Sequence, residues 1–239
     1  MSRTFYFVEM EKILIPHEGF DTPQQLTLFN QGIDADPRTK LKVVESNFYN
    51  GWDRLEGFHE QIDKTPRRMN GNPDYLHVSI VGGNLPFTSY LKKDEKMFLF
   101  NTSKSNVLGL QKRLVKFFPD TFIPKKSKVN FPYLLKMLQN ATVVSSWFNG
   151  INGKVNAVGL FGERVDLDSA FEHYKNIGEL SAITLELESE HSSKPFEVMI
   201  TKFFGVILYT NWELKKDLDF LLELKTLLFH EEALNKNTD

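Results

Sequence analysis

The sequence predicts an α+β fold with mainly antiparallel sheets and three to four helices. Short stretches rich in aromatic and β-branched residues, separated by turn residues, are typical of strands. Only a few windows carry apolar residues at helical spacing. The strands and helices also lack the regular alternation that a doubly wound parallel sheet requires. With 239 residues, 41% of them hydrophobic and 25% charged, the chain is long enough for one or two domains.

The first half is expected to consist mostly of strands. Aromatic, β-branched and alternating residues predict strands over five stretches: residues 4–15, 41–49, 54–62, 75–81 and 97–100. Between the second and third, Asn50-Gly51 favours a two-residue hairpin turn, because both residues tolerate a positive φ.

One amphipathic helix follows these strands. Val107, Leu110 and Leu114 recur at spacings of three and four, which predicts a helix over residues 104–118 with its lysines facing water. Residues 122–128 are basic and are expected to form a linker. The linker places a boundary between an N-terminal lobe, 1–122, and a C-terminal lobe, 129–239. Asn130 is expected to cap a short helix that carries Pro132 in its first turn.

The C-terminal lobe is expected to contain five more strands, two of them before a helix. A loop with Gly150 and Gly153 joins strands 141–148 and 154–161. Asp166 or Asp168 then begins a helix that ends near Asn176. Ser169 and Glu172 have the spacing of a capping box, and Gly178 suits a left-handed C-cap.

Alternating residues predict the last three strands over 180–188, 196–200 and 206–209. Asn211 is then expected to cap a long, leucine-rich closing helix. The leucines of that helix could pack across a homodimer interface instead of into their own core, so a homo-oligomer is one partner that the sequence allows.

Charge is unevenly distributed along the chain. The net charge of −2 combines −5 over residues 1–63, +10 over 64–136 and −7 over 137–239. A basic block of this kind fits the neutralisation of nucleic-acid phosphates. It also fits pairing with the chain's own acidic flanks or with an acidic protein.

The leading hypothesis is a non-enzymatic cytoplasmic protein that contacts DNA or RNA through this basic segment. Phosphate contacts of this kind give affinity without sequence choice. Ten residues are expected to make them: Lys64, Arg67, Arg68, Lys92, Lys93, Lys112, Arg113, Lys125, Lys126 and Lys128.

Several chemistries find no support in the sequence. The absence of cysteine removes disulfides, thiol nucleophiles and thiolate metal sites. No phosphate-binding loop or nucleophile elbow is present, so no catalytic residue, cofactor or metal is expected. No apolar run approaches the roughly 20 residues of a membrane span, and no signal peptide is seen at the N-terminus.

A metal-dependent nuclease is the remaining alternative. The acidic residues that would serve it are Asp166, Asp168, Glu186 and Glu188. Asp166 and Asp168, with Glu172 and His173, form the densest ligand-like group. Helix capping and dipole complementation explain that group better.

A strand–turn–helix unit carries a resemblance to a known class. Met97-Phe98-Leu99-Phe100, the polar residues 101–105 and the helix through Phe118 follow several N-terminal strands. This order resembles phage accessory proteins of the Rex-type exclusion class over about half the chain. The resemblance implies a DNA-associating, non-enzymatic protein of a phage or mobile element that works with partners.

Overall fold

The computed structural model is α+β, with antiparallel strand pairing throughout the described residues, as the sequence predicts. It describes residues 2–22, 38–63, 67–68, 75–76, 80–82, 86–138, 141–151, 154–189, 192–210 and 212–229. These residues form two compact units. One unit contains residues 6–125. The other contains residues 2–5 together with the chain from residue 126 onward.

The unit of residues 6–125 is a strand array covered by one helix. Its strands follow the order β1-β10-β9-β4-β3-β2, and β11 pairs with the far part of β1. The bounds are β1 Arg3–Ile13, β2 Phe20–Asp21, β3 Thr39–Tyr49, β4 Trp52–His59, β9 Phe87–Lys92, β10 Met97–Phe100, α1 Lys104–Phe117 and β11 Phe122–Pro124. Two short pairs complete it, β5 Gln61–Asp63 with β8 Ile80–Gly82 and β6 Arg67–Arg68 with β7 Tyr75–Leu76.

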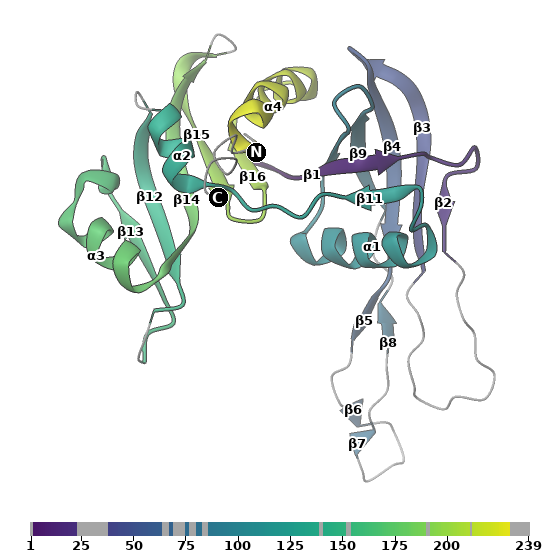
Figure 1. Ribbon diagram of the computed structural model, residues 1–239, viewed down its shortest axis with the longest axis horizontal. Coiled ribbons are helices and arrows are strands. Elements are labelled where there is room, and N and C mark those ends of the chain that lie inside the picture. The colour runs from purple at the N-terminus through teal and green to yellow at the C-terminus, as the bar shows by residue number, and fades with distance from the viewer. Residues whose placement is uncertain are drawn as a thin grey trace, which may run out of the picture. The chain divides into compact units, whose positions relative to one another are not determined.

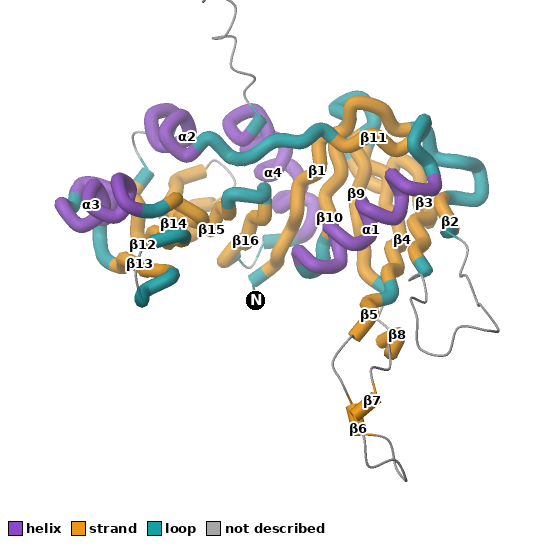
Figure 2. Tube along the Cα trace, turned by 60° about the horizontal axis from the view of Figure 1, so that its bottom comes forward, coloured by secondary structure: helices purple, strands orange, loops and turns teal. Residues whose placement is uncertain are grey.

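The core of this unit lies between α1 and one face of the strands (Figure 1, Figure 2). Val107, Leu110 and Leu114 form the buried stripe of α1. They pack in one cluster with Phe98 and Phe122. The stripe predicted from spacing is therefore confirmed as the contact surface of the helix.

The other unit has five strands of its own and three helices. Its strands follow the order β13-β12-β14-β15-β16, and β16 is followed by β1, whose first residues belong to this unit. The bounds are α2 Phe131–Met137, β12 Thr142–Asn149, β13 Ala157–Phe161, a 3₁₀ turn η1 Val165–Leu167, α3 Ser169–Ile177, β14 Glu179–Ser189, β15 Ser192–Thr201, β16 Gly205–Tyr209 and α4 Leu214–Leu228.

Two groups of contacts close the core of this unit. Phe171 of α3 packs on Phe148 of β12, with ring centroids 5.3 Å apart. Phe220 of α4 packs on Phe196 of β15 at 5.2 Å. Leu218, Leu221, Leu224 and Leu228 of α4 are buried, whereas Leu214, Leu222 and Leu227 are half-buried. The closing helix therefore buries much of its stripe in the folded chain, and its role as a dimer surface stays a prediction.

Several local predictions hold. Asn50 and Gly51, with φ of 43° and 78°, connect β3 to β4 as a two-residue turn. Asn130 caps α2, its Oδ1 accepting a hydrogen bond from the Tyr133 N–H at 3.1 Å. Asp168 caps α3 in the same way, accepting from the Ala170 N–H at 2.7 Å.

Other local predictions are wrong. Because Asp168 is the N-cap, Ser169 cannot supply a capping box. Gly178 is extended, with φ of −143°, and makes no left-handed cap. Glu213 takes the N-cap position of α4, and Asn211 lies outside the described residues.

Four strands were not predicted from the sequence: β2 and β6, which lie in stretches expected to be loops, and β9 and β11. The expected linker of residues 122–128 begins with β11, where Phe122 pairs with Ile13. β9 was not expected at all, although it is a central strand between β4 and β10. Its Ser89 and Tyr90 are both buried, so the strand lacks the alternation that marks a half-buried strand.

Candidate nucleic-acid interface

Among the described helices, α1 has the largest excess of basic over acidic residues. Its 14 residues include four basic side chains and no acidic one. Lys104, Lys112 and Lys116 are exposed. At 100° per residue these three lysines fall within an arc of about 120°. Leu108 and Val115, which are 51% and 41% exposed, lie on the same arc.

The local sequence explains why the helix presents this face. Ser103 caps the N-terminus, its Oγ accepting from the Asn106 N–H at 3.4 Å. The apolar stripe turns toward the strands, so the lysines opposite it remain in water. We call the three exposed lysines, Lys104, Lys112 and Lys116, the α1 lysines.

Arg113 does not face water, and its prediction as a solvent-facing phosphate contact needs correction. Its residue is only 5% exposed, and its guanidinium lies 4.5 Å from the centre of the Phe117 ring. Gly109 brings α1 close to β4, because a Cβ there would lie 2.1 Å from Nε2 of His59. This close approach buries the side of the helix on which Arg113 lies.

His59 shares this buried region. Its Nδ1 is 2.8 Å from Oγ1 of Thr39, and the residue is 4% exposed. Burial, the larger cause, and the charge of Arg113 together lower the pKa of His59 to about 4. The imidazole is therefore neutral at physiological pH.

Three of the predicted lysines are paired with carboxylates of their own unit. Lys93 Nζ lies 2.6 Å from Oδ2 of Asp53. Lys92 Nζ lies 3.3 Å from Oδ2 of Asp94 and also donates to the Asn50 carbonyl. Lys125 Nζ donates to Oε1 of Glu9 at 3.0 Å. These ion pairs already neutralise much of the charge that the hypothesis assigns to phosphates.

The basic segment is also divided between the units. Lys126 and Lys128 are exposed and belong to the unit that contains the C-terminal helices, whereas Lys112 belongs to the other unit. Lys64 lies outside the described residues. Arg67 and Arg68 form β6, but their side chains are not described.

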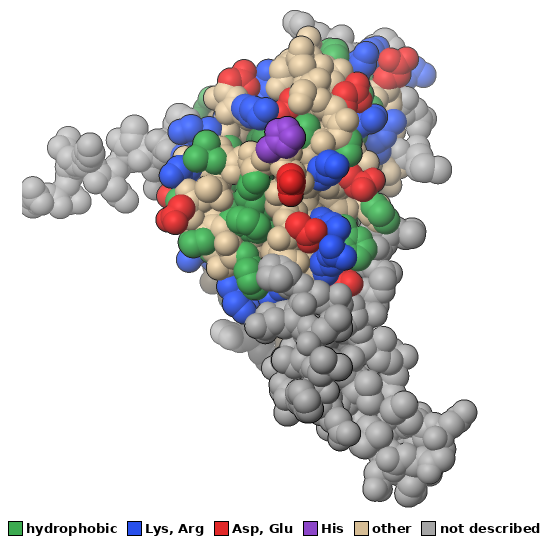
Figure 3. Space-filling view, turned by 90° about the vertical axis from the view of Figure 1, so that its right-hand side faces the viewer, with side chains coloured by type: hydrophobic (Ala, Val, Ile, Leu, Met, Phe, Trp, Pro, Cys, Tyr) green, Lys and Arg blue, Asp and Glu red, His purple; other side chains and the backbone are tan. Residues whose placement is uncertain are grey.

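The face shown in Figure 3 has mixed charge. Lysine and arginine side chains alternate there with aspartate and glutamate, and no single sign covers the surface. Along β2 and β3, Asp21 pairs with Arg38 at 3.1 Å and with Lys40 at 3.2 Å. A surface of this kind has little net attraction for a polyanion.

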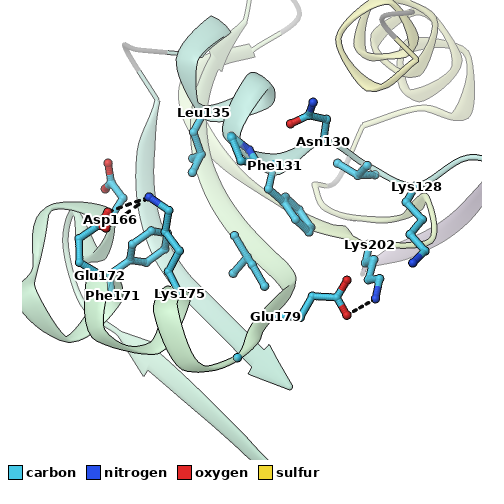
Figure 4. A pocket seen from close by; sticks show the side chains of 14 residues that line it. Lys128, Asn130, Phe131, Leu135, Asp166, Phe171, Glu172, Lys175, Glu179 and Lys202 are labelled. Atoms are coloured by element: carbon cyan, nitrogen blue, oxygen red, sulfur yellow. Dashed lines mark hydrogen bonds and ion pairs between the residues drawn. The ribbon is translucent and has the colours of Figure 1, made fainter. Parts of the chain in front are cut away.

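A hollow of about 550 Å³ lies between α2 and α3 at the start of β14 (Figure 4). Phe131, Leu135 and Leu180 contribute apolar surface. Its lysines face carboxylates: Lys175 Nζ donates to Oε1 of Glu172 at 3.0 Å, and Lys202 pairs with Glu179. The hydrogen bond from Lys202 lowers the pKa of Glu179, and the nearby charge of Lys128 adds to this effect. The lining is balanced in charge, so the hollow does not extend a basic surface.

The acidic residues considered for a nuclease are not gathered around a metal site. Asp168 is occupied as a helix cap. Glu186 lies opposite Glu197 across β14 and β15, exposed to solvent. Across the described ranges, no group of three or more His, Cys, Asp or Glu side chains is placed to hold a metal ion.

Lys104 and Lys116 share the exposed face of α1 with Lys112 but are not among the ten residues predicted from the sequence. Their spacing from Lys112, eight residues and four residues, puts all three on one helix face. A helical projection of residues 104–117 carries this signal. Lys112 and Arg113 are instead neighbours in the sequence, and Arg113 lies on the buried side of the helix.

Comparison with known proteins gives no family assignment. Neither protein-family models nor curated proteins yield a match to this chain. Within the described part of the chain, none of the helices has the length and hydropathy of a bilayer-spanning segment.

Proposed function

We propose that the chain is a non-enzymatic protein that binds nucleic acid and that the α1 lysines make its principal phosphate contacts. The supporting observation is the exposed face of α1, which carries three lysines and no carboxylate. Lys104 and Lys116 are separated by about 18 Å along the helix axis. That length reaches several successive phosphates of a duplex, which carries a charge about every 1.7 Å of its axis.

The proposal concerns only part of the basic segment, the exposed lysines that share one face of α1. Lys92, Lys93 and Lys125 already have carboxylate partners. Transfer of such a lysine to a phosphate would leave its carboxylate without its counter-charge, which reduces the gain in binding. Arg113 would serve by supporting the helix, since its side chain is buried.

Leu108 and Val115 give the same face a second property. Both are exposed between the lysines, and apolar side chains at a nucleic-acid surface contact sugars and the thymine methyl group. The interface would then combine phosphate neutralisation with apolar contact. Most of its affinity would come from the charges and would fall steeply with salt.

The resemblance to Rex-type exclusion proteins points to the same class of function. The residues that carry it, from Met97 through the end of α1, include the whole basic helix. On this proposal the protein is a DNA-associating accessory of a phage or mobile element.

Fluorescence anisotropy with labelled duplex DNA and single-stranded RNA tests the proposal on the full chain. The test variant changes the three α1 lysines together to glutamate. The matched control changes Lys154, Lys215 and Lys216 to glutamate, because these are also exposed and lie in the other unit. Both variants have the same net charge, so they separate a local contact from general attraction.

We expect the wild type to bind at about 50 mM salt and to weaken strongly by about 200 mM. The α1 variant should lose at least about tenfold in affinity and should reduce the salt slope by about 3, since each lost phosphate contact removes about 1. The control should stay within about threefold of the wild type. Equal losses in both variants, or no binding by the wild type at low salt, would refute the proposal.

A further inference from the structure

β13 is the last strand at one end of its array among the described residues, and its Ala157 and Phe161 are exposed. It pairs with β12, and no other described strand lies beside it. The Gly150 N–H donates to the Asn156 carbonyl at 3.1 Å, and the Gly162 N–H donates to the Val144 carbonyl at 3.1 Å. In this register the even-numbered residues of β13 direct their amides toward β12. Ala157, Gly159 and Phe161 therefore direct their N–H and C=O groups outward.

The sequence of β13 contains none of the usual protections of an edge strand. Ala-Val-Gly-Leu-Phe has no charged residue and no proline, and its register with β12 has no bulge. Natural sheets use charges, proline and bulges to keep exposed edges from pairing with other chains. Their absence here indicates an edge that accepts another strand.

Apolar surface accompanies the open edge. Phe161 is 69% exposed and Trp147 is 37% exposed, and their rings meet edge to face with centroids 5.3 Å apart. Gly159 lies beside them, and a Cβ there would come within 2.9 Å of the Phe161 ring. Phe161 and part of Trp147 are thus exposed to solvent next to the outward backbone groups of β13.

We propose that β13 pairs with β13 of a second copy of this chain, antiparallel and centred on Gly159. The two copies of Gly159 would then exchange both of their outward hydrogen bonds. Ala157 of each copy would face Phe161 of the other. All the outward N–H and C=O groups of the three residues find partners in this arrangement.

The side-chain sizes along β13 favour a second copy as the occupant. In the antiparallel arrangement Ala157 of each copy faces Phe161 of the other, so a small side chain lies opposite a large one. The two copies of Gly159 face each other. Val158 and Leu160 also face each other, on the side that packs on α3. The strand is therefore complementary to itself in size on both faces. This interface differs from one formed by the closing helix, which has Leu218, Leu221, Leu224 and Leu228 buried.

Sedimentation velocity of the full chain at a series of concentrations tests the proposal. We expect a reversible dimer whose dissociation constant rises at least about tenfold in Phe161→Lys and in Ala157→Pro. The first change puts a charge on the edge. The second removes an outward N–H but leaves the bonds to β12 in place. Tyr209→Lys is the matched control, because Tyr209 is an exposed aromatic residue on another strand, and its dimer should match the wild type.

Cysteine pairing tests the register itself. The chain has no cysteine, so Ala157→Cys with Phe161→Cys introduces the only thiols. Facing residues of a hydrogen-bonded antiparallel pair have Cα atoms about 5.5 Å apart, which a disulfide can span. Oxidation should give a covalent dimer from the double variant and leave Tyr209→Cys monomeric under denaturing conditions.

Three results would overturn the proposal. The wild type could remain a monomer at every concentration. Its dimer could persist unchanged in both edge variants while circular dichroism shows them folded. The double cysteine variant could fail to form more covalent dimer than Tyr209→Cys.

Discussion

Arg3 reaches the first turn of the last helix, where its Nη1 pairs with Oδ2 of Asp217. The same nitrogen donates to the Trp212 carbonyl at 2.9 Å, and Thr210 Oγ1 donates to the other carboxylate oxygen at 3.3 Å. Asp217 is completely buried. Burial raises its pKa, although the hydrogen bonds and charge of Arg3 act in the opposite direction. The start of the chain thus supplies the counter-charge of a carboxylate near its end.

Removal of Arg3 should strongly destabilise the unit that holds Asp217. Arg3→Ala leaves a buried carboxylate without its partner, which typically costs about 3–5 kcal/mol. Urea unfolding followed by tryptophan fluorescence measures the loss. Arg38→Ala is the control, because its pair with Asp21 is exposed and should contribute no more than about 1 kcal/mol. Equal effects of the two changes would contradict this account of the buried pair.

As the pH is lowered below about 6.5, the free energy of unfolding should decrease because of His59. In the unfolded chain the imidazole has its ordinary pKa of 6.5, whereas in the folded protein the pKa of His59 is about 4. Between these values the unfolded state binds more protons, so the full contribution is present above 6.5 and is lost progressively toward 4. The difference amounts to about 3 kcal/mol at most. Urea unfolding at a series of pH values should show the decline, and His59→Gln should flatten it.

Gly109→Ala should destabilise the protein although alanine is the better helix former. In an open helix this change stabilises by up to about 1 kcal/mol. Here the new methyl would lie 2.1 Å from Nε2 of His59, and overpacking of this kind costs about 1–3 kcal/mol. Thermal unfolding gives the sign. A rise in melting temperature would show that α1 does not depend on this close approach to β4.

Lys93 and Lys112 should separate stability from binding. Lys93 pairs with Asp53, whose residue is 5% exposed and whose Oδ1 also accepts from the Asn47 N–H at 2.8 Å. Lys93→Ala should therefore lower stability by about 1 kcal/mol and leave nucleic-acid affinity unchanged. Lys112→Ala should weaken nucleic-acid binding and leave stability unchanged. Anisotropy titrations and urea unfolding of both variants make the comparison, and weaker binding by Lys93→Ala alone would reverse the assignment.

Sequence patterns predicted the elements whose residues are governed by local chemistry. The stripe of Val107, Leu110 and Leu114, the turn at Asn50-Gly51 and the Asn130 cap depend on spacing or on one side chain near its own backbone. β9 was not predicted because it is covered on both faces, so burial at adjacent positions removes the period of two. β11 was not predicted because a three-residue strand is defined by its partner, here Ile13, more than by its own composition.

The candidate interface was predicted in part. Net charge located the basic segment, and Lys112 was among the residues selected from it. Charge along a chain does not tell which lysines meet carboxylates after folding, as Lys93 does with Asp53 and Lys125 with Glu9. The burial of Arg113 depends on Gly109 and His59, which are 50 residues apart in the sequence. Such pairings arise from tertiary structure and have no local signature.

The division of β1 between the two units affects how the chain can mature on the ribosome. Residues 6–125 form a unit that is complete once the first half has been synthesised, so this unit can close early. Residues 2–5 are synthesised before that unit, yet Asp217, with which Arg3 pairs, follows Arg3 by 214 residues. The unit that contains residues 2–5 can therefore be finished only after the unit of residues 6–125 has been synthesised.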